Sequence, residues 1–136
     1  MKAMTFTQGA NIVTVSAAVV YGTDWSDNRL NQFELLTADG VDVVYDDGPT
    51  QAHGVLVMKG LSYTDGDALR TWLKTKAIYA LNTFSISALA NTDLGKGKNT
   101  IITSARWDGG QSTSGAFSLV APGNYDVNFP YRFLRS

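Results

Sequence analysis

The stretch that decides the fold lies near the C-terminus and runs Tyr125-Asp126-Val127-Asn128-Phe129-Pro130-Tyr131-Arg132-Phe133. Apolar and polar residues alternate along all of it, which is the period-two pattern of a β-strand with one buried face. Pro130 falls on the polar face and has no N–H to donate, so an edge position or a β-bulge is expected there rather than a central ladder position. The stretch therefore predicts a sheet with a core on one side.

Shorter patterns of the same kind predict further strands, eight or nine in all. β-Branched and apolar residues fill 12–21, and glycines bound the apolar run at 54–60. Alternation marks the segments 84–88, 101–107 and 117–119. The polar stretches between strands, at 22–29, 90–99 and 108–115, are expected to be long loops and the places to look for a site.

A hairpin is predicted where two apolar segments, Gln32–Leu36 and Val41–Tyr45, flank Ala38-Asp39-Gly40. Asp-Gly readily adopts the positive φ angles of a two-residue hairpin turn. We therefore expect these two segments to pair with each other.

One segment breaks the alternation and predicts a single helix over about residues 65–76. Leu69 and Trp72 fall at helical spacing. Thr64, three residues before Asp67, is the expected N-cap in a variant of the capping box. Trp72 is expected to fill the core between the helix and the sheet.

Length and composition describe a small globular protein. The chain has 136 residues and a mass of 14.7 kDa, which fits one domain over residues 1–136. Hydrophobic residues make up 44% and charged residues 17%, which excludes intrinsic disorder. Together with the strand pattern, this predicts a mainly β fold with one helix, either a β-sandwich or a split β-barrel that the helix flanks.

The residue counts exclude several kinds of functional site. The chain has no cysteine, which excludes disulfides, thiol nucleophiles and cysteine zinc sites. His53 is the only histidine, so no site can use two imidazoles, and a structural or solvated role is expected for it. We expect no enzymatic activity, no cofactor and no metal. No apolar run is long enough to span a membrane, and a net charge of −1 gives no reason to expect nucleic acid as a partner.

Two groups of residues leave other functions open. Trp25 and Trp107, the latter beside Asp108-Gly109-Gly110, could stack on sugar rings in a carbohydrate-binding module, although packing in a core or an interface accounts for the same residues. A more remote alternative is a small hydrolase that uses acids among Asp24, Glu34 and Asp46.

Charge is unevenly distributed along the chain. Residues 24–67 hold nine acidic and two basic side chains, a balance of −7, whereas residues 68–136 hold eight basic and three acidic ones, a balance of +5. If folding keeps these charges on opposite sides, identical subunits can pack head to tail, in the kind of interface that closes into rings. Folding that interleaves the two segments would instead cancel the asymmetry.

The order of elements resembles the small tail proteins of long-tailed bacteriophages, most closely the distal tail or minor tail proteins. The resemblance covers about Asn31 to Phe133 and rests on the Asp39-Gly40 hairpin, the run at 54–62, the helix at 67–73 and the strands at 83–86 and 125–133. It implies a structural virion protein that assembles in the host cytoplasm. Such a protein forms a ring, usually hexameric, between the tail tube and the hub or baseplate, with those tail proteins as partners. Tail-tube proteins resemble the same plan, so a tail-tube subunit stays open as an alternative.

Overall fold

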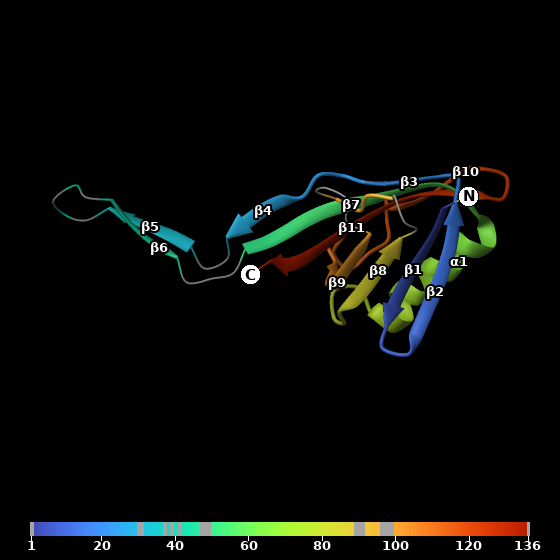
Figure 1. Ribbon diagram of the computed structural model, residues 1–136, viewed down its shortest axis with the longest axis horizontal. Coiled ribbons are helices and arrows are strands. Elements are labelled where there is room, and N and C mark those ends of the chain that lie inside the picture. The colour runs from blue at the N-terminus through green and yellow to red at the C-terminus, as the bar shows by residue number, and fades with distance from the viewer. Residues whose placement is uncertain are drawn as a thin grey trace.

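The fold is built from antiparallel strands and a helix, as the computed structural model in Figure 1 shows. The structure describes residues 2–29, 32–36, 38, 40, 42–46, 50–88, 92–95 and 100–135. The strands are β1 (Lys2–Gln8), β2 (Asn11–Ala17), β3 (Val19–Gly22), β4 (Ser26–Arg29), β5 (Gln32–Leu36), β6 (Asp42–Asp46), β7 (Thr50–Ser62), β8 (Phe84–Ala88), β9 (Ile101–Trp107), β10 (Phe117–Ala121) and β11 (Asn124–Arg135). A helix, α1 (Tyr63–Trp72), continues into a π-helical turn, η1 (Leu73–Ala77).

Nine of the strands form one antiparallel sheet. Its order is β2-β1-β8-β9-β11-β7-β3, with β10 beside β11 and β4 beside β7. The two end strands of this path, β2 and β3, are consecutive in the chain and are separated only by Ala18, whose N–H donates to the Lys59 carbonyl at 2.9 Å. The sheet must therefore curl back on itself, and the predicted mainly β fold with one helix is confirmed in the described part of the chain.

The core lies between the β1–β8 side of the curled sheet and its β7–β11 side. Phe129 of β11 contacts Phe6 of β1, with ring centroids 5.0 Å apart, and Phe84 of β8 at 5.8 Å. Trp72 of α1 contacts Phe6 at 5.7 Å and Phe84 at 5.2 Å, and is only 5% exposed. The predicted role of Trp72 between helix and sheet is confirmed.

The helix begins two residues earlier than predicted. Its N-cap is Ser62, whose Oγ accepts a hydrogen bond from the Asp65 N–H at 3.2 Å, so the assignment of Thr64 as N-cap was wrong. The two caps have the same hydroxyl-to-acid spacing in the sequence. The Asp65 carboxylate also accepts a hydrogen bond from the Ser16 N–H of β2 at 3.0 Å. This contact ties the first turn of the helix to the sheet.

The expected edge position at Pro130 is found locally, although β11 as a whole lies inside the sheet. β11 pairs with β7 along its whole length, and on its other side with β10 before Pro130 and with β9 after it. The Pro130 carbonyl accepts the Asp108 N–H at 3.1 Å. In an antiparallel strand the N–H and C=O of one residue point to the same side, so the missing donor faces the gap between β10 and β9. The register shift of β11 against β7 lies elsewhere, at Tyr125/Asp126.

The sequence patterns missed two strands and joined two others. β1 was not predicted, although Met4 and Phe6 alternate with polar neighbours, and β4 lies in the segment that was expected to be a loop. The predicted strand at 12–21 divides at Ala18 into β2 and β3. For these reasons the described residues contain eleven strands, rather than eight or nine.

The sheet extends from the curled part, here called the body, into a narrow ribbon. The ribbon consists of β4 (Ser26–Arg29) paired with residues 50–53 of β7, which pair in turn with residues 132–135 of β11. Beyond it, β5 and β6 form a separate two-stranded sheet, here called the arm, which projects away from the body (Figure 1). The predicted pairing of the two segments is confirmed; Val41, the first residue of the predicted second strand, lies outside the described residues.

Candidate functional site

A row of polar residues crosses the sheet where the ribbon joins the body. The register places Ser26, His53, Arg132 and Arg106 side by side on β4, β7, β11 and β9. Residues directly opposite one another in antiparallel strands point to the same face of a sheet. The row therefore gathers one histidine and two arginines on one face.

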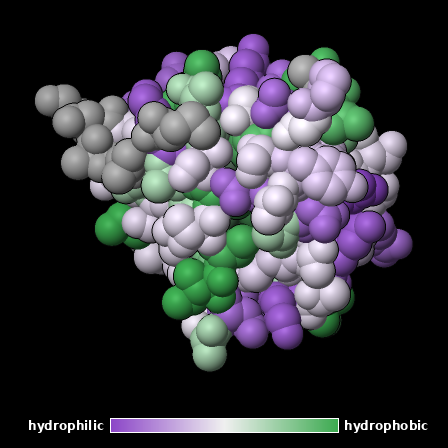
Figure 2. All heavy atoms as spheres, turned by 90° about the vertical axis from the view of Figure 1, so that its right-hand side faces the viewer, coloured by the Kyte–Doolittle hydropathy of each residue, from purple (hydrophilic) through white to green (hydrophobic). Residues whose placement is uncertain are grey.

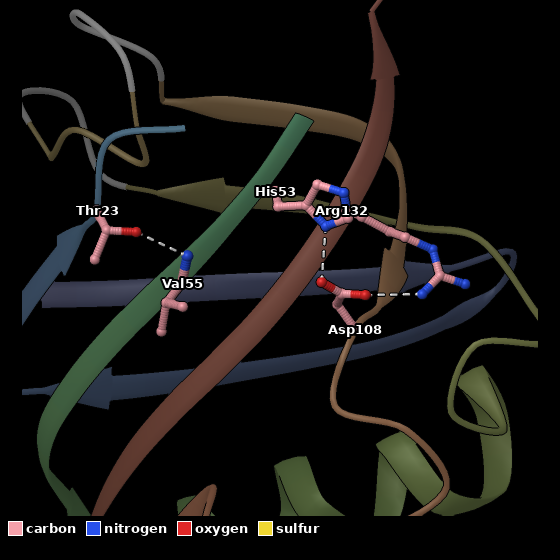
Figure 3. A network of polar contacts seen from close by, with 5 residues as sticks. All are labelled: Thr23, His53, Val55, Asp108 and Arg132. Atoms are coloured by element: carbon pink, nitrogen blue, oxygen red, sulfur yellow. Dashed lines mark hydrogen bonds and ion pairs between the residues drawn. The ribbon is translucent and has the colours of Figure 1, made fainter. Parts of the chain in front are cut away.

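Asp108, which directly follows β9, connects two members of this row (Figure 3). Its Oδ2 lies 2.9 Å from His53 Nδ1, and its Oδ1 accepts from Arg132 Nη1 at 2.9 Å. The three side chains are between 25% and 30% exposed, so water screens the ion pair only in part. The carboxylate holds three strands together, which agrees with the structural role expected for His53. His53 Nε2 is buried and has no hydrogen-bond partner among the described residues.

Arg106 is held differently from Arg132. Its Nη1 donates to the carbonyls of Ala80 and Leu81, both at 2.8 Å. These carbonyls belong to the turn after the helix, where Ile78 and Tyr79 have positive φ angles of 52° and 54°. Arg106 thus fixes a turn with a backbone conformation that side-chain-bearing residues rarely adopt. Within the described part of the chain, no carboxylate forms an ion pair with it.

A hollow opens beside the two arginines because β9 and β11 diverge. Their pairing consists of only two residue pairs, Tyr131 with Trp107 and Arg132 with Arg106. Next to it β9 has a bulge against β8, with Ser104 at a φ of 53°. Bulges bend a strand and increase its twist. The resulting hollow, of about 380 Å³, is lined by both arginines and Ser104, and we call it the wedge.

Trp25, one of the two predicted aromatic site residues, is half-buried and takes part in a chain of hydrogen bonds. Its Nε1–H donates to the Tyr131 hydroxyl at 2.8 Å, and that hydroxyl donates to the Leu94 carbonyl at 2.5 Å. Its ring lies edge-on against Phe133, with centroids 4.9 Å apart. A Cβ on Gly95 would lie 1.9 Å from Nε1, so only glycine fits beside this ring.

Tyr131 is fully buried and carries the one shifted pKa that the described residues show. Burial raises the pKa of Tyr131 to about 12, since a phenolate would lose its hydration there. The hydrogen bond from Trp25 lowers the pKa in part, and the nearby Asp93 raises it. At neutral pH the phenol is therefore protonated and can donate to Leu94.

Trp107, the other predicted aromatic, is 1% exposed and packs edge-on against Phe129 with centroids 4.8 Å apart. Its Nε1 is buried without a partner in the described residues, and Gly109 packs against the indole. Trp25 and Trp107 thus lie in packed positions. Sugar stacking on either ring stays a prediction, and it requires the ring to leave these contacts.

The three acids of the hydrolase alternative lie on separate elements. Asp24 lies in the connection between β3 and β4, whereas Glu34 and Asp46 lie on β5 and β6. The register of the arm pairs Glu34 with Val44 and Asp46 with Gln32. The acid that does form a polar site is Asp108, which the sequence analysis placed beside Trp107, at the start of a loop expected to be a place to look for a site. Over the described ranges, no group of three or more His, Cys, Asp or Glu residues is placed to hold a metal ion.

Compared with models of known protein families, with curated proteins and with solved structures, the chain shows no significant match. Among the residues that the structure describes, no helix is long and apolar enough to cross a membrane. Inference about function therefore rests on the geometry of the body, the ribbon and the arm.

Proposed function

We propose that the protein is a structural subunit that associates with copies of itself into a closed ring. Following the resemblance to distal tail proteins, this ring is a hexamer in the tail of a phage, between the tail tube and the hub or baseplate, and it assembles in the host cytoplasm. The observation that carries the proposal is the arm, a two-stranded sheet of its own that projects from the body (Figure 1).

A lone two-stranded hairpin is at best marginally stable in water. The arm register pairs apolar residues with each other, Phe33 with Tyr45 and Leu35 with Val43. Cross-strand pairs at alternate positions share one face of a hairpin. A separate hairpin of this kind favours a partner that stabilises it.

The charge of the arm favours a second copy of this chain as that partner. Residues 32–46 hold four acidic side chains and no lysine or arginine. Eight of the eleven basic residues lie after Ala68, among them Lys74 and Lys76 near the end of the helix and Arg106 and Arg132 in the sheet. An acidic projection and a basic body fit a head-to-tail contact, which repeats around a ring.

The end of the molecule opposite the arm shows no broad apolar face (Figure 2). Figure 2 shows the end of the molecule opposite the arm, where apolar side chains form small groups separated by polar ones. Contacts between copies would also use strand edges. β2 is an end strand of the sheet and carries Ile12, which is 63% exposed.

Light scattering of the full chain during gel filtration, with electron microscopy of the eluted particles, tests the proposal. We expect a mass several times 14.7 kDa and ring-shaped particles. A variant with residues 32–46 replaced by a Gly-Ser linker should elute as a monomer. A wild-type chain that is monomeric at every concentration up to about 100 μM would contradict ring formation by this chain alone.

A further inference from the structure

We propose that the wedge between β9 and β11 is the receiving site for the arm of a second copy, and that an acidic side chain of that arm binds between Arg106 and Arg132. The inference rests on the proposed self-association and names the surface through which it occurs.

The first observation is the pairing of two like charges. Arg106 and Arg132 are directly opposite each other on β9 and β11. Like charges at such positions destabilise a sheet, because the two side chains start only about 5 Å apart. Asp108 compensates Arg132, but in the described chain no acidic side chain compensates Arg106. An anion between the two arginines would remove this repulsion.

The second observation is the hydrogen-bonding capacity that remains. The printed bonds of each guanidinium use Nη1 alone, toward Ala80 and Leu81 for Arg106 and toward Asp108 for Arg132. Nε and Nη2 of both arginines have no hydrogen-bond partner among the described residues. None of these four atoms belongs to the buried polar atoms that lack a partner. Guanidinium groups bind carboxylates through two parallel N–H donors, so the wedge favours a carboxylate over a neutral group.

The third observation is a free strand edge at the same place. After Arg132, residues 133–135 of β11 pair with β7 on one side and have no described strand on the other. The hollow between this edge and Ser104 measures about 380 Å³. Such an edge can accept an added strand through its main-chain groups.

The occupant that fits these features is the arm. It consists of strands, its residues Glu34, Asp42 and Asp46 are acidic, and it has no basic residue. Within one molecule the arm projects away from the body. It lies beyond the end of the ribbon that is farther from β9 (Figure 1). The arm of another copy is therefore the source to which the inference commits. Lys74 and Lys76 of η1 are exposed and do not line the wedge, so they are the comparison site.

A charge swap in the full chain tests this arrangement. One variant carries Arg106→Glu, and the other carries Glu34→Lys, Asp42→Lys and Asp46→Lys. We expect each variant alone to associate at least about tenfold more weakly than the wild type, since like charges then meet at the contact. An equal mixture should assemble again, with the two variants alternating, because both kinds of contact in it join opposite charges. Lys74→Glu, which makes the same charge change on the helix, should leave association within about twofold.

The outcomes separate the inference from the function on which it rests. If the wild type assembles and the triple arm variant assembles equally well, or if Lys74→Glu impairs assembly while Arg106→Glu does not, the wedge is not the receiving site but self-association stands. If the wild type itself never assembles, both proposals fail. Should Arg106→Glu not fold, because it loses the Ala80 and Leu81 contacts, the arm variant mixed with Arg132→Glu gives the same test.

Discussion

The body and the arm consist of the same kind of antiparallel strand pair, but they differ in what covers them. In the body, Phe129 is fully buried and contacts rings from β1, β8 and β9. The arm is a separate sheet of two strands. Polar contacts lie at the junction of body and ribbon, namely the Trp25–Tyr131–Leu94 chain and the contacts of Asp108 with His53 and Arg132. The comparison teaches that an apolar face stabilises the chain itself only where another element packs on it.

The largest effect is expected in the centre of the body. Phe129→Ala should lower the free energy of unfolding by about 3–5 kcal/mol, because it removes a ring that others surround and leaves a cavity. Urea denaturation followed by tryptophan fluorescence measures this. Leu119→Ala, at a side chain 61% exposed, is the control and should change stability by less than about 0.5 kcal/mol. Equal losses for both would remove the distinction between body and surface.

A smaller effect is expected at the junction of body and ribbon, at high pH. The folded pKa of Tyr131 is raised from 10.0 to about 12, so the unfolded chain loses this proton before the folded chain does. The contribution is fully present below pH 10 and is lost as the pH rises through 12, in total about 2–3 kcal/mol. Urea midpoints between pH 9 and 12 measure it.

Tyr131→Phe is the matched control for that titration and a test in its own right. The variant should lose this part of the pH dependence. At neutral pH it should be less stable by about 1–3 kcal/mol, since the Trp25 N–H and the Leu94 carbonyl lose their partner. An unchanged pH dependence in the variant would show that another group is responsible.

A still smaller effect is expected for the contacts that Asp108 makes with His53 and Arg132 of the ribbon. Asp108→Asn should cost about 0.5–1 kcal/mol, because His53 and Arg132 lose a carboxylate that water partly screens. Thermal unfolding by circular dichroism measures it, with the exposed Asp67→Asn as a neutral control. A loss of more than about 3 kcal/mol would place Asp108 among the core contacts instead.

The smallest effect on stability is expected for the arm. Replacement of residues 32–46 by a Gly-Ser linker should change unfolding of the monomeric body by less than about 0.5 kcal/mol, since loop length contributes little. Urea denaturation at low concentration measures this. A large loss would mean that the arm belongs to the packed fold.

Sequence periodicity predicted those parts of the fold that local patterns determine. The β5–β6 hairpin followed from Asp39-Gly40, and the burial of Trp72 followed from its helical spacing. Pro130 has a strand partner on one side only, as its missing donor predicted, but the placement of β11 inside the sheet is a property of the assembled sheet. The Ser62 cap was missed since Thr64 offers the same spacing.

The candidate site was harder to predict than the fold. His53, Arg106, Asp108 and Arg132 lie on β7, β9 and β11 and just after β9, and only the register brings them together. No local pattern of the sequence encodes that register. The aromatic rings were easier to find than to interpret. Trp25 and Trp107 are conspicuous in the sequence, but their packing depends on glycines that lack a Cβ. Trp25 packs against Gly95, which is distant in the sequence, and Trp107 packs against Gly109, two residues after it.

Hydrogen exchange of the wild-type chain at two concentrations tests the central claim that the body stabilises itself whereas the arm is stabilised between copies. The account predicts that amides of β5 and β6 exchange slowly in concentrated solution and fast after dilution to the monomer, while those of β7 and β11 in the body stay protected in both. Arm amides that are equally protected in the dilute monomer would contradict it.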